Sequence, residues 1–421
     1  MVLELGVMCP SAGAVSWGVR TLVVGAGIFG VTAARELRAR GAEVVLLDPG
    51  PVPHAAAAST DISKVVRREY GSDQLYTGWM EDALEKFRCW NRELGDSLFH
   101  ETGVLFMSGG PLTGGGFEAD SVALLEARGA AVTRVTRAEV AARFPAWAAS
   151  TLPEGMHDEA GGWVESGRLV ARLAELAVAE GVVMRQGRAL RLLEQGSRVV
   201  GVAVAREHEH EHEHEHEHEH ADEVVLCMGA WTTDLVPSLG GTLRAVAQPV
   251  FHLRPREPAL FEGVRFPVFG ADIARAGWYG FPLHPHAGVV KVAHHGAGLA
   301  VHPDAPARVV GPGDVARLRG FLTATFPALA DAELVHTRAC MYSDTADGHL
   351  LIARDPERPG LTVAAGDSGH AFKFAPLLGR WIADAALATA APPARFAWRG
   401  DASTPVDPPA TPTGDAARAS D

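Results

Sequence analysis

The sequence predicts a mixed α/β (α+β) fold, in which a parallel-sheet domain built from several chain segments receives an inserted domain of antiparallel strands. A buried strand, a glycine turn, a helix and a second strand follow one another over residues 20–50. Short runs of alternating apolar residues occur over 240–335, which is typical of an antiparallel sheet. A strand, a glycine-rich turn and a helix return over 361–388. With 421 residues, the chain can bury the cores of two or three domains.

The composition indicates a globular protein and excludes several classes. Apolar residues make up 47% and charged residues 21% of the chain. No apolar stretch reaches the roughly 18 to 20 residues that span a bilayer, and the first residues lack a basic n-region, so we expect neither a membrane protein nor a signal peptide. No basic stripe indicates nucleic acid as a partner. The cysteines lack the spacing of disulfides or zinc sites, which favours the cytoplasm and no metal; they are Cys9, Cys89, Cys227 and Cys340.

The first unit begins with an apolar strand at 22–24, followed by a helix over 31–40 and a strand over 44–47. The turn between strand and helix reads GAGIFG, which fits the G-x-G-x-x-G pattern of a dinucleotide site. Its glycines permit a tight turn, a close approach to a pyrophosphate and close helix packing, while the helix N-terminus favours phosphate. An acidic residue ends the second strand, where it can bind a ribose hydroxyl. The predicted cofactor-binding residues here are Gly25, Gly27, Ile28, Phe29, Gly30 and Asp48. The pattern does not separate NAD from FAD.

Later segments extend the same domain. An amphipathic helix leads into a strand over 165–184, an antiparallel ribbon follows over 188–206, and a strand over 221–231 ends at a glycine turn. We therefore assign 20–71, 151–235 and 336–392 to the cofactor-binding domain, and 72–150 and 236–335 to the inserted substrate domain. Residues 1–19 are expected to be an extension, and the Pro- and Ala-rich residues 393–421 a disordered tail.

A histidine–glutamate repeat occupies 207–220 and carries seven of the glutamates that make the net charge −13. With a period of two, a strand would place all histidines on one face, where they could bind zinc or nickel weakly. The favoured interpretation is a low-complexity hairpin insertion at an exposed turn, where added residues cost little. A non-catalytic metal-binding protein centred on this repeat is the alternative from another functional class.

Five further segments occur together in a characteristic order: STDISKVVRREYG (59–71), GWYGFP (277–282), VVKVAHHG (289–296), ACMYSDT (339–345) and AAGDSGHAFKFAP (364–376). With the glycine turn, they resemble the monomeric sarcosine oxidase family, within the D-amino-acid oxidase group of flavoproteins. The resemblance runs from about residue 20 to residue 392. It implies an FAD-binding Rossmann-like domain, a sheet-rich substrate domain and a monomer. The later segments would have no purpose in an NAD-dependent dehydrogenase.

The resemblance also implies how FAD is held. The cysteine of the C-M-Y motif in this family forms a thioether to the flavin, so Cys340 is expected to attach FAD covalently. A lone buried cysteine without these flanking motifs would more often be inert. The further cofactor-binding residues that the resemblance implies are Ser59, Thr60, Ser63, Lys64, Gly229, Trp231, Met341, Gly366, Gly369, His370 and Lys373.

The same resemblance assigns catalytic roles. Arg67 and Lys373 match the pair that grips a substrate carboxylate, for which an arginine fork is suited. Lys291 matches the lysine that activates oxygen, since a cation stabilises the reduced oxygen species; a strand lysine facing solvent is the alternative. His295, Tyr279 and Tyr342 match the lining of the substrate cavity. Lys64 stands where the sarcosine oxidase has an arginine, so the charge is kept without the planar fork. Arg68 matches no role and is expected to be a surface charge.

We therefore expect an FAD-dependent oxidase of a secondary, cyclic or N-methyl amino acid. A small amine-bearing carboxylate would be oxidised to an imine, and molecular oxygen reduced to hydrogen peroxide. The alternative is a biosynthetic tailoring flavin dehydrogenase or desaturase with a larger substrate. Asp344 and Asp367 stand where the sarcosine oxidase has a lysine and a phenylalanine, and would suit a substrate with an extra cation.

Overall fold

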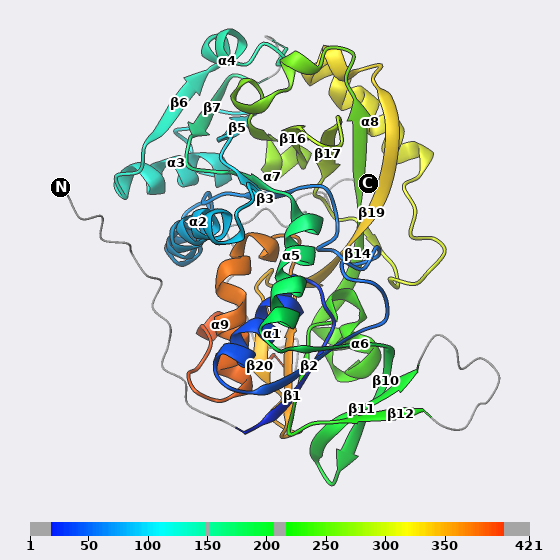
Figure 1. Ribbon diagram of the computed structural model, residues 1–421. Coiled ribbons are helices and arrows are strands. Elements are labelled where there is room, and N and C mark those ends of the chain that lie inside the picture. The colour runs from blue at the N-terminus through cyan, green and yellow to red at the C-terminus, as the bar shows by residue number, and fades with distance from the viewer. Residues whose placement is uncertain (1–17, 149–151, 206–215, 400–421) are drawn as a thin grey trace.

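The computed structural model describes residues 18–148, 152–205 and 216–399 (Figure 1). Two large sheets dominate it, one mostly parallel and one mostly antiparallel, and Figure 1 shows them in the lower and upper halves of the molecule. The expected mixed α/β fold is confirmed. In these residues, no helix is both long and apolar enough to cross a membrane.

The first sheet contains the glycine turn and has six strands. In sheet order they are β20 (Leu351–Arg354), β21 (Leu361–Ala365), β13 (Glu223–Leu226), β1 (Arg20–Val24), β2 (Glu43–Asp48) and β9 (Val183–Gln186). All neighbours pair in parallel except β20 and β21. Because both faces are covered, its strands are nearly continuous apolar runs.

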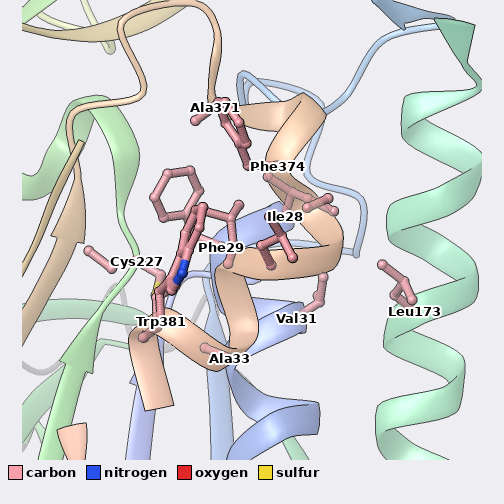
Figure 2. Close-up of a cluster of buried hydrophobic side chains, with 14 of the residues drawn as sticks. Ile28, Phe29, Val31, Ala33, Leu173, Cys227, Ala371, Phe374 and Trp381 are labelled. Carbon is pink, nitrogen blue, oxygen red and sulfur yellow. The ribbon is translucent and has the colours of Figure 1, made fainter. Parts of the chain in front are cut away.

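Successive residues of this sheet point to opposite layers. Val23 packs in a core shared with the helices α1 (Ile28–Ala39), α5 (Ser166–Ala179) and α9 (Ala375–Ala386). Figure 2 shows part of this core, with Phe29 of α1 near Trp381 of α9. Leu22 packs instead against a three-stranded antiparallel sheet. That sheet consists of β10 (Arg188–Gln195), β11 (Arg198–Ala205) and β12 (Glu217–His220).

The second large sheet has nine strands. They are β18 (Leu299–Ala300), β14 (Leu243–Arg254), β17 (Val290–His294), β16 (Trp278–Leu283), β15 (Val268–Ala271), β5 (Val104–Ser108), β7 (Glu154–Asp158), β6 (Val132–Thr136) and β19 (Glu333–Thr345), the last of which pairs with β14. One neighbouring pair, β15 with β5, is parallel, so the sheet is mixed. The helices α8 (Pro312–Thr325) and α3 (Phe117–Ala127) contribute to cores on its two sides.

The expected domain boundaries differ from the observed structure at three places, two strands and one helix. Residues 154–158 and 333–345 form β7 and β19 in the nine-stranded sheet, although they fall partly or wholly in segments assigned to the cofactor-binding domain. A strand belongs to the sheet that receives its hydrogen bonds, and β19 pairs with β14 along its whole length. The helix α2 (Gln74–Leu94), assigned to the inserted domain, packs in the core of α1 and α9.

A small sheet packs into the cores of both large sheets, with Val66 and Val164 in one core and Trp163 in the other. It consists of β3 (Lys64–Val66), β8 (Gly162–Val164) and β4 (Phe99–His100). The remaining short helices are α4 (Arg137–Arg143), α6 (Thr232–Leu235), α7 (Ile273–Ala276), η1 (Gly229–Trp231), η2 (Pro237–Gly241), η3 (Pro258–Leu260), η4 (Gly263–Arg265), η5 (Pro327–Leu329), η6 (Ala371–Phe374) and η7 (Ala394–Phe396).

The expectation of a disordered tail from residue 393 is wrong for its first residues. Phe396 of η7 is fully buried between aromatic rings, 5.4 Å from Trp79 and 5.3 Å from Trp381 between ring centroids. Arg395 forms an ion pair with Asp73. Residues 400–421, residues 1–17 of the expected extension and residues 206–215, which include the first part of the repeat, lie outside the described residues. The last part of the repeat forms β12, which pairs antiparallel with β11.

Candidate functional site

The glycine turn lies at the carboxyl end of β1, where the parallel strands open onto a cavity of about 290 Å³. Gly25 has a φ of +99°, a left-handed conformation that favours glycine. A Cβ on Gly30 would collide with the carbonyl oxygen of Gly25. Gly27 is the N-cap residue of α1 and lines the cavity, so the helix N-terminus faces this space.

Asp48 closes the turn from the end of β2. Its carboxylate accepts hydrogen bonds from the backbone N–H groups of Ala26 at 2.7 Å and Gly50 at 3.2 Å. Burial raises the pKa of Asp48, while these N–H groups oppose that shift. The side chain lines the cavity beside the turn, where a carboxylate can accept from a ribose hydroxyl.

Most of the expected cofactor residues border this cavity. They are Gly25, Gly27, Ile28, Phe29, Asp48, Ser59, Lys64, Gly229, Trp231, Met341 and Gly369. Gly30, Thr60, Ser63, Cys340 and Gly366 are not on its wall. The hydroxyls of Thr60 and Ser63 are nevertheless buried and have no hydrogen-bond partner in the described part of the chain. Such unpartnered groups, in a segment whose Ser59 and Lys64 line a cavity at a helix N-terminus, fit a bound dinucleotide such as FAD.

A second cavity, of about 80 Å³, adjoins the first. Lys64, Tyr342, Gly369 and Phe372 line both, so the two spaces meet at these residues. Six of the seven expected catalytic residues border the smaller cavity: Lys64, Arg67, Tyr279, His295, Tyr342 and Lys373. The hydroxyls of Tyr279 and Tyr342 are 3.4 Å apart, and the rings of His295 and Tyr342 are 5.9 Å apart. His370 lies here rather than in the larger cavity.

Arg67 borders the smaller cavity, and one nitrogen of its guanidinium has no hydrogen-bond partner among the described residues. Only 8% of the residue is exposed, and its guanidinium lies 5.1 Å from the ring centroid of Tyr70 and 5.4 Å from that of Phe106. Its Nη1 atom is buried and has no hydrogen-bond partner among the described residues. A buried guanidinium nitrogen without a partner favours an anion as the ligand.

Lys291 does not border either cavity. Its ammonium is 2.6 Å from the Asp61 carboxylate and donates to the carbonyl oxygen of Ser63 at 2.6 Å. Burial lowers the pKa of Lys291 to about 8, although Asp61 opposes that shift. Burial disfavours ionisation of Asp61 too, but the charge of Lys291, with His252 at 3.2 Å, holds the pKa of Asp61 well below its usual value. Lys291 is therefore neither a solvent-facing strand lysine nor directly open to the cavities.

Cys340 is also set back from the cavity surface. Only 1% of the residue is exposed, and its sulfur lies 3.6 Å from Lys64 Nζ and 3.9 Å from the carbonyl oxygen of Ala58. Ala58 and Lys64 both line the larger cavity. The thiol thus lies directly behind its wall. The described cysteines, Cys89, Cys227 and Cys340, are free.

Two expectations about charged residues need correction. Arg68 is not a surface charge, because it forms a two-pronged ion pair with the buried Asp158 at 2.7 and 2.9 Å. Asp344 borders neither cavity, and burial followed by the charge of Asp367 raises its pKa to about 7. Asp367 lines the larger cavity, but its oxygens accept from the N–H groups of Ser343 and Gly369.

Sequence reasoning missed Asp61 and Tyr70, which hold Lys291 and Lys373. One signal was available: the chain has only four lysines, Lys64, Lys86, Lys291 and Lys373, among 38 basic residues. Three of the four lie at this site. Among the described residues, no group of three or more His, Cys, Asp or Glu side chains could hold a metal ion.

Comparison with known proteins agrees with this geometry. The monomeric sarcosine oxidase of Streptomyces avermitilis is 30% identical, with 87% of this chain and 93% of that protein covered. The L-saccharopine oxidase of Schizosaccharomyces pombe is 30% identical, with 90% and 93% covered. The solved structure of the fructosamine oxidase Amadoriase II from Aspergillus fumigatus shares the fold, with a TM-score of 0.78, 24% identity, and 92% and 91% covered. Residues 20–385 match the FAD dependent oxidoreductase (DAO) family, and the chain therefore belongs to that family.

Proposed function

We propose that the protein is an FAD-dependent oxidase of a small secondary, cyclic or N-methyl amino acid. The observation that carries this proposal is the unpartnered Nη1 of Arg67, which shares the smaller cavity with Lys373 beside the cofactor-binding cavity. Two cations without a carboxylate partner among the described residues suit the carboxylate of a substrate. The small volume, about 80 Å³, favours a small substrate over the larger one of a tailoring enzyme.

The relatives support amine oxidation as the chemistry. Their names specify sarcosine, saccharopine and fructosyl amines as substrates. Bound FAD, held by the residues that line the larger cavity, would supply the oxidising chemistry, namely removal of a hydride from the carbon next to the substrate nitrogen with oxygen as the final electron acceptor. The residues of this chain would bind and orient the amine beside it.

Each cavity residue then has a defined task. Arg67 and Lys373 would hold the carboxylate, which fixes the amine end toward the junction of the two cavities. Tyr279 and Tyr342, whose hydroxyls lie 3.4 Å apart, would close the wall around that end. Burial raises the pKa of both phenols, so they stay neutral at working pH. His295 would complete the wall.

Lys291 supports oxygen as the second substrate. Its buried charge lies close to Lys64, which borders both cavities, and a cation there would stabilise the anionic products of oxygen reduction. Hydrogen peroxide is then the expected product.

Attachment of FAD through Cys340 is part of the proposal. The sulfur of Cys340 lies behind Lys64 and Ala58 of the cavity wall. A thioether between this sulfur and the flavin would therefore have to pass between these two residues. Acid precipitation of the purified protein tests the bond. We expect the yellow colour in the pellet, whereas a colourless pellet would mean that the cofactor is not covalently held.

The oxidase function is tested by measuring hydrogen peroxide during turnover of N-methyl and cyclic amino acids. We expect about one peroxide for each imine formed. Imine formation with an artificial electron acceptor, but without peroxide in air, would instead identify a dehydrogenase.

A further inference from the structure

Lys373 is the end of a buried hydrogen-bond chain whose direction the structure determines. His370 Nε2 lies 2.8 Å from the carbonyl oxygen of Gly348, which only accepts, so Nε2 carries a hydrogen. Burial, with the nearby Lys373, holds the pKa of His370 well below its usual value, so the ring is neutral and its Nδ1 accepts. The Tyr70 hydroxyl, 3.0 Å from Nδ1, therefore donates to it. The same phenol oxygen accepts from Lys373 Nζ at 3.2 Å.

No carboxylate balances the charge of Lys373. In the described part of the chain, this lysine forms no ion pair, although only 2% of it is exposed. Glu69 favours the ammonium form of Lys373 electrostatically, but burial, followed by the charge of Asp158, raises the pKa of Glu69 to about 8 and so weakens it as a counter-charge. The titratable groups around Lys373 are Arg67, Glu69, Tyr70 and Tyr76, His370 on its own turn, and Lys64, Tyr279, His295 and Tyr342 across the cavity.

The ionisation of Lys373 therefore depends on what occupies the cavity. Burial, followed by the charge of Arg67, holds its pKa well below the usual value of a lysine. An arriving carboxylate would supply the missing negative charge and favour the ammonium form. The Tyr70 oxygen keeps the nitrogen in place in both forms, because a neutral amine and an ammonium can each donate one N–H to it.

We propose that capture of a substrate carboxylate in the smaller cavity is coupled to uptake of one proton by Lys373, with Tyr70 and His370 as the positioning residues that hold the lysine for it. The proton comes from solvent and adds to the lone pair of Nζ, and no electrons are transferred. This inference rests on the proposed function, because it needs a carboxylate at Arg67 and Lys373.

The presence of lysine instead of arginine at position 373 supports the coupling of carboxylate binding to proton uptake. Arginine supplies nearly all the basic residues of this chain, yet lysine stands at this position. Arginine stays charged at every accessible pH, whereas a buried lysine can exchange its proton. A site that only had to attract an anion would be served as well by a second arginine.

Calorimetry of the FAD-loaded protein tests the proposal, with methoxyacetate as an unreactive carboxylate probe. Titrations in buffers with different ionisation enthalpies report the number of protons bound with the probe. We expect uptake of about one proton between the pKa of Lys373 in the free protein and its raised pKa in the complex, declining to none at lower pH, where the lysine is already charged, and at higher pH, where it stays neutral in both states. Methoxyacetamide, the uncharged counterpart, is expected to cause no uptake.

The decisive variant is Lys373→Arg, which keeps the charge but cannot release a proton. It should still bind methoxyacetate, and the uptake should vanish. Binding by the natural protein without proton uptake would overturn the coupling and leave the proposed function standing. Failure of the probe to bind at all would overturn both.

The role of Tyr70 is tested with a matched pair of variants. Tyr76 stacks on Tyr70 at 4.9 Å, and its hydroxyl lies 3.0 Å from His349 Nδ1, so it makes a similar hydrogen bond away from Lys373. We expect Tyr70→Phe to weaken methoxyacetate binding about tenfold above neutral pH and to shift the affinity profile to lower pH. Tyr76→Phe should leave the affinity and its pH profile unchanged. Equal effects of both substitutions would show that Tyr70 only supports the structure.

Discussion

At the scale of single residues, the site depends on buried cations that are held in three different ways. Lys291 has a carboxylate partner, Lys373 has a neutral phenol, and Arg67 lies against aromatic rings with one nitrogen unpartnered. An unpaired buried charge is costly, so the last two fit a site completed by an anion. The paired Lys291 fits a group that keeps its position throughout the reaction.

The first prediction concerns Lys291 and oxygen. The pKa of this lysine is lowered to about 8, so it is charged below that pH and loses its charge above it. We expect the rate at which the chemically reduced protein is reoxidised by oxygen to fall as the pH rises through about 8. Negative charge on the reduced cofactor would raise the pKa of Lys291, and the fall would then occur at a higher pH. Stopped-flow absorbance measures this rate without any amine.

Removing the charge should abolish that profile. Lys291→Met is expected to slow reoxidation by roughly a hundredfold at neutral pH and to make it independent of pH in this range. The exposed Lys86 offers the matched control, Lys86→Met, which should leave the rate unchanged. A Lys291→Met protein that reoxidises at the natural rate would exclude this lysine from the oxygen reaction.

The second prediction concerns Asp61. Its side chain is 2% exposed and faces Lys291 at 2.6 Å, so Asp61→Asn leaves a buried ammonium without its counter-charge. The free energy of unfolding should fall by about 3 to 5 kcal/mol, measured by denaturant titration. Asp331→Asn breaks an exposed ion pair with Arg256 and should cost less than about 1 kcal/mol. Similar losses in both variants would contradict this account of the buried pair.

At the scale of elements, local sequence patterns predicted the helices, strands and turns that depend on local sequence. The strand–turn–helix–strand unit, the ribbon over 188–206 and the helix after the GHAFKF turn all lie where expected, because apolar periodicity and glycine positions specify them. The assignments of β7 and β19 to the nine-stranded sheet could not be predicted in this way. Their partners, β5 and β14, are distant in sequence, and no local pattern identifies them.

The residues of the candidate site likewise divide into those that the sequence predicts and those that only the folded structure identifies. The residues of the glycine turn could be read from their spacing, and the cavity residues came from a family resemblance. Asp61 and Tyr70 could not be found, because their tasks depend on contacts with residues more than two hundred positions away. Cys340 and Lys291 both lie close to Lys64 of the cavity wall, but their burial behind the wall is a property of the packed structure that the sequence does not reveal.

The third prediction concerns the segment after α9. Phe396 is fully buried between Trp79 and Trp381, so η7 closes one side of the core around α1 and α9. Phe396→Ala should lower the free energy of unfolding by about 3 to 5 kcal/mol, measured in denaturant. The nearby Ala397→Gly is the control, with a much smaller effect expected. Unchanged stability of the Phe396 variant would mean that this segment does not belong to the core.

At the scale of the whole molecule, the site lies where the two large sheets meet. The parallel sheet contributes the turn after β1 and the end of β2, and the nine-stranded sheet contributes Tyr279 and Tyr342. The segment between β2 of the parallel sheet and β3 also contacts the nine-stranded sheet, because Asp61 and Ser63 contact Lys291 of β17. Under the proposed function, the parallel sheet would hold the cofactor and the nine-stranded sheet would shape part of the substrate cavity, so substrate choice could vary while cofactor binding is kept.

The central claim is that an amine substrate is held by its carboxylate on Arg67 and Lys373. The most direct test compares kcat/KM for the best substrate of the peroxide screen with kcat/KM for its carboxamide, in the natural protein and in Arg67→Gln. We predict a preference for the carboxylate of at least about a hundredfold, which Arg67→Gln should reduce by a factor of ten or more. Equal kcat/KM values for the acid and the amide in the natural protein would contradict the claim.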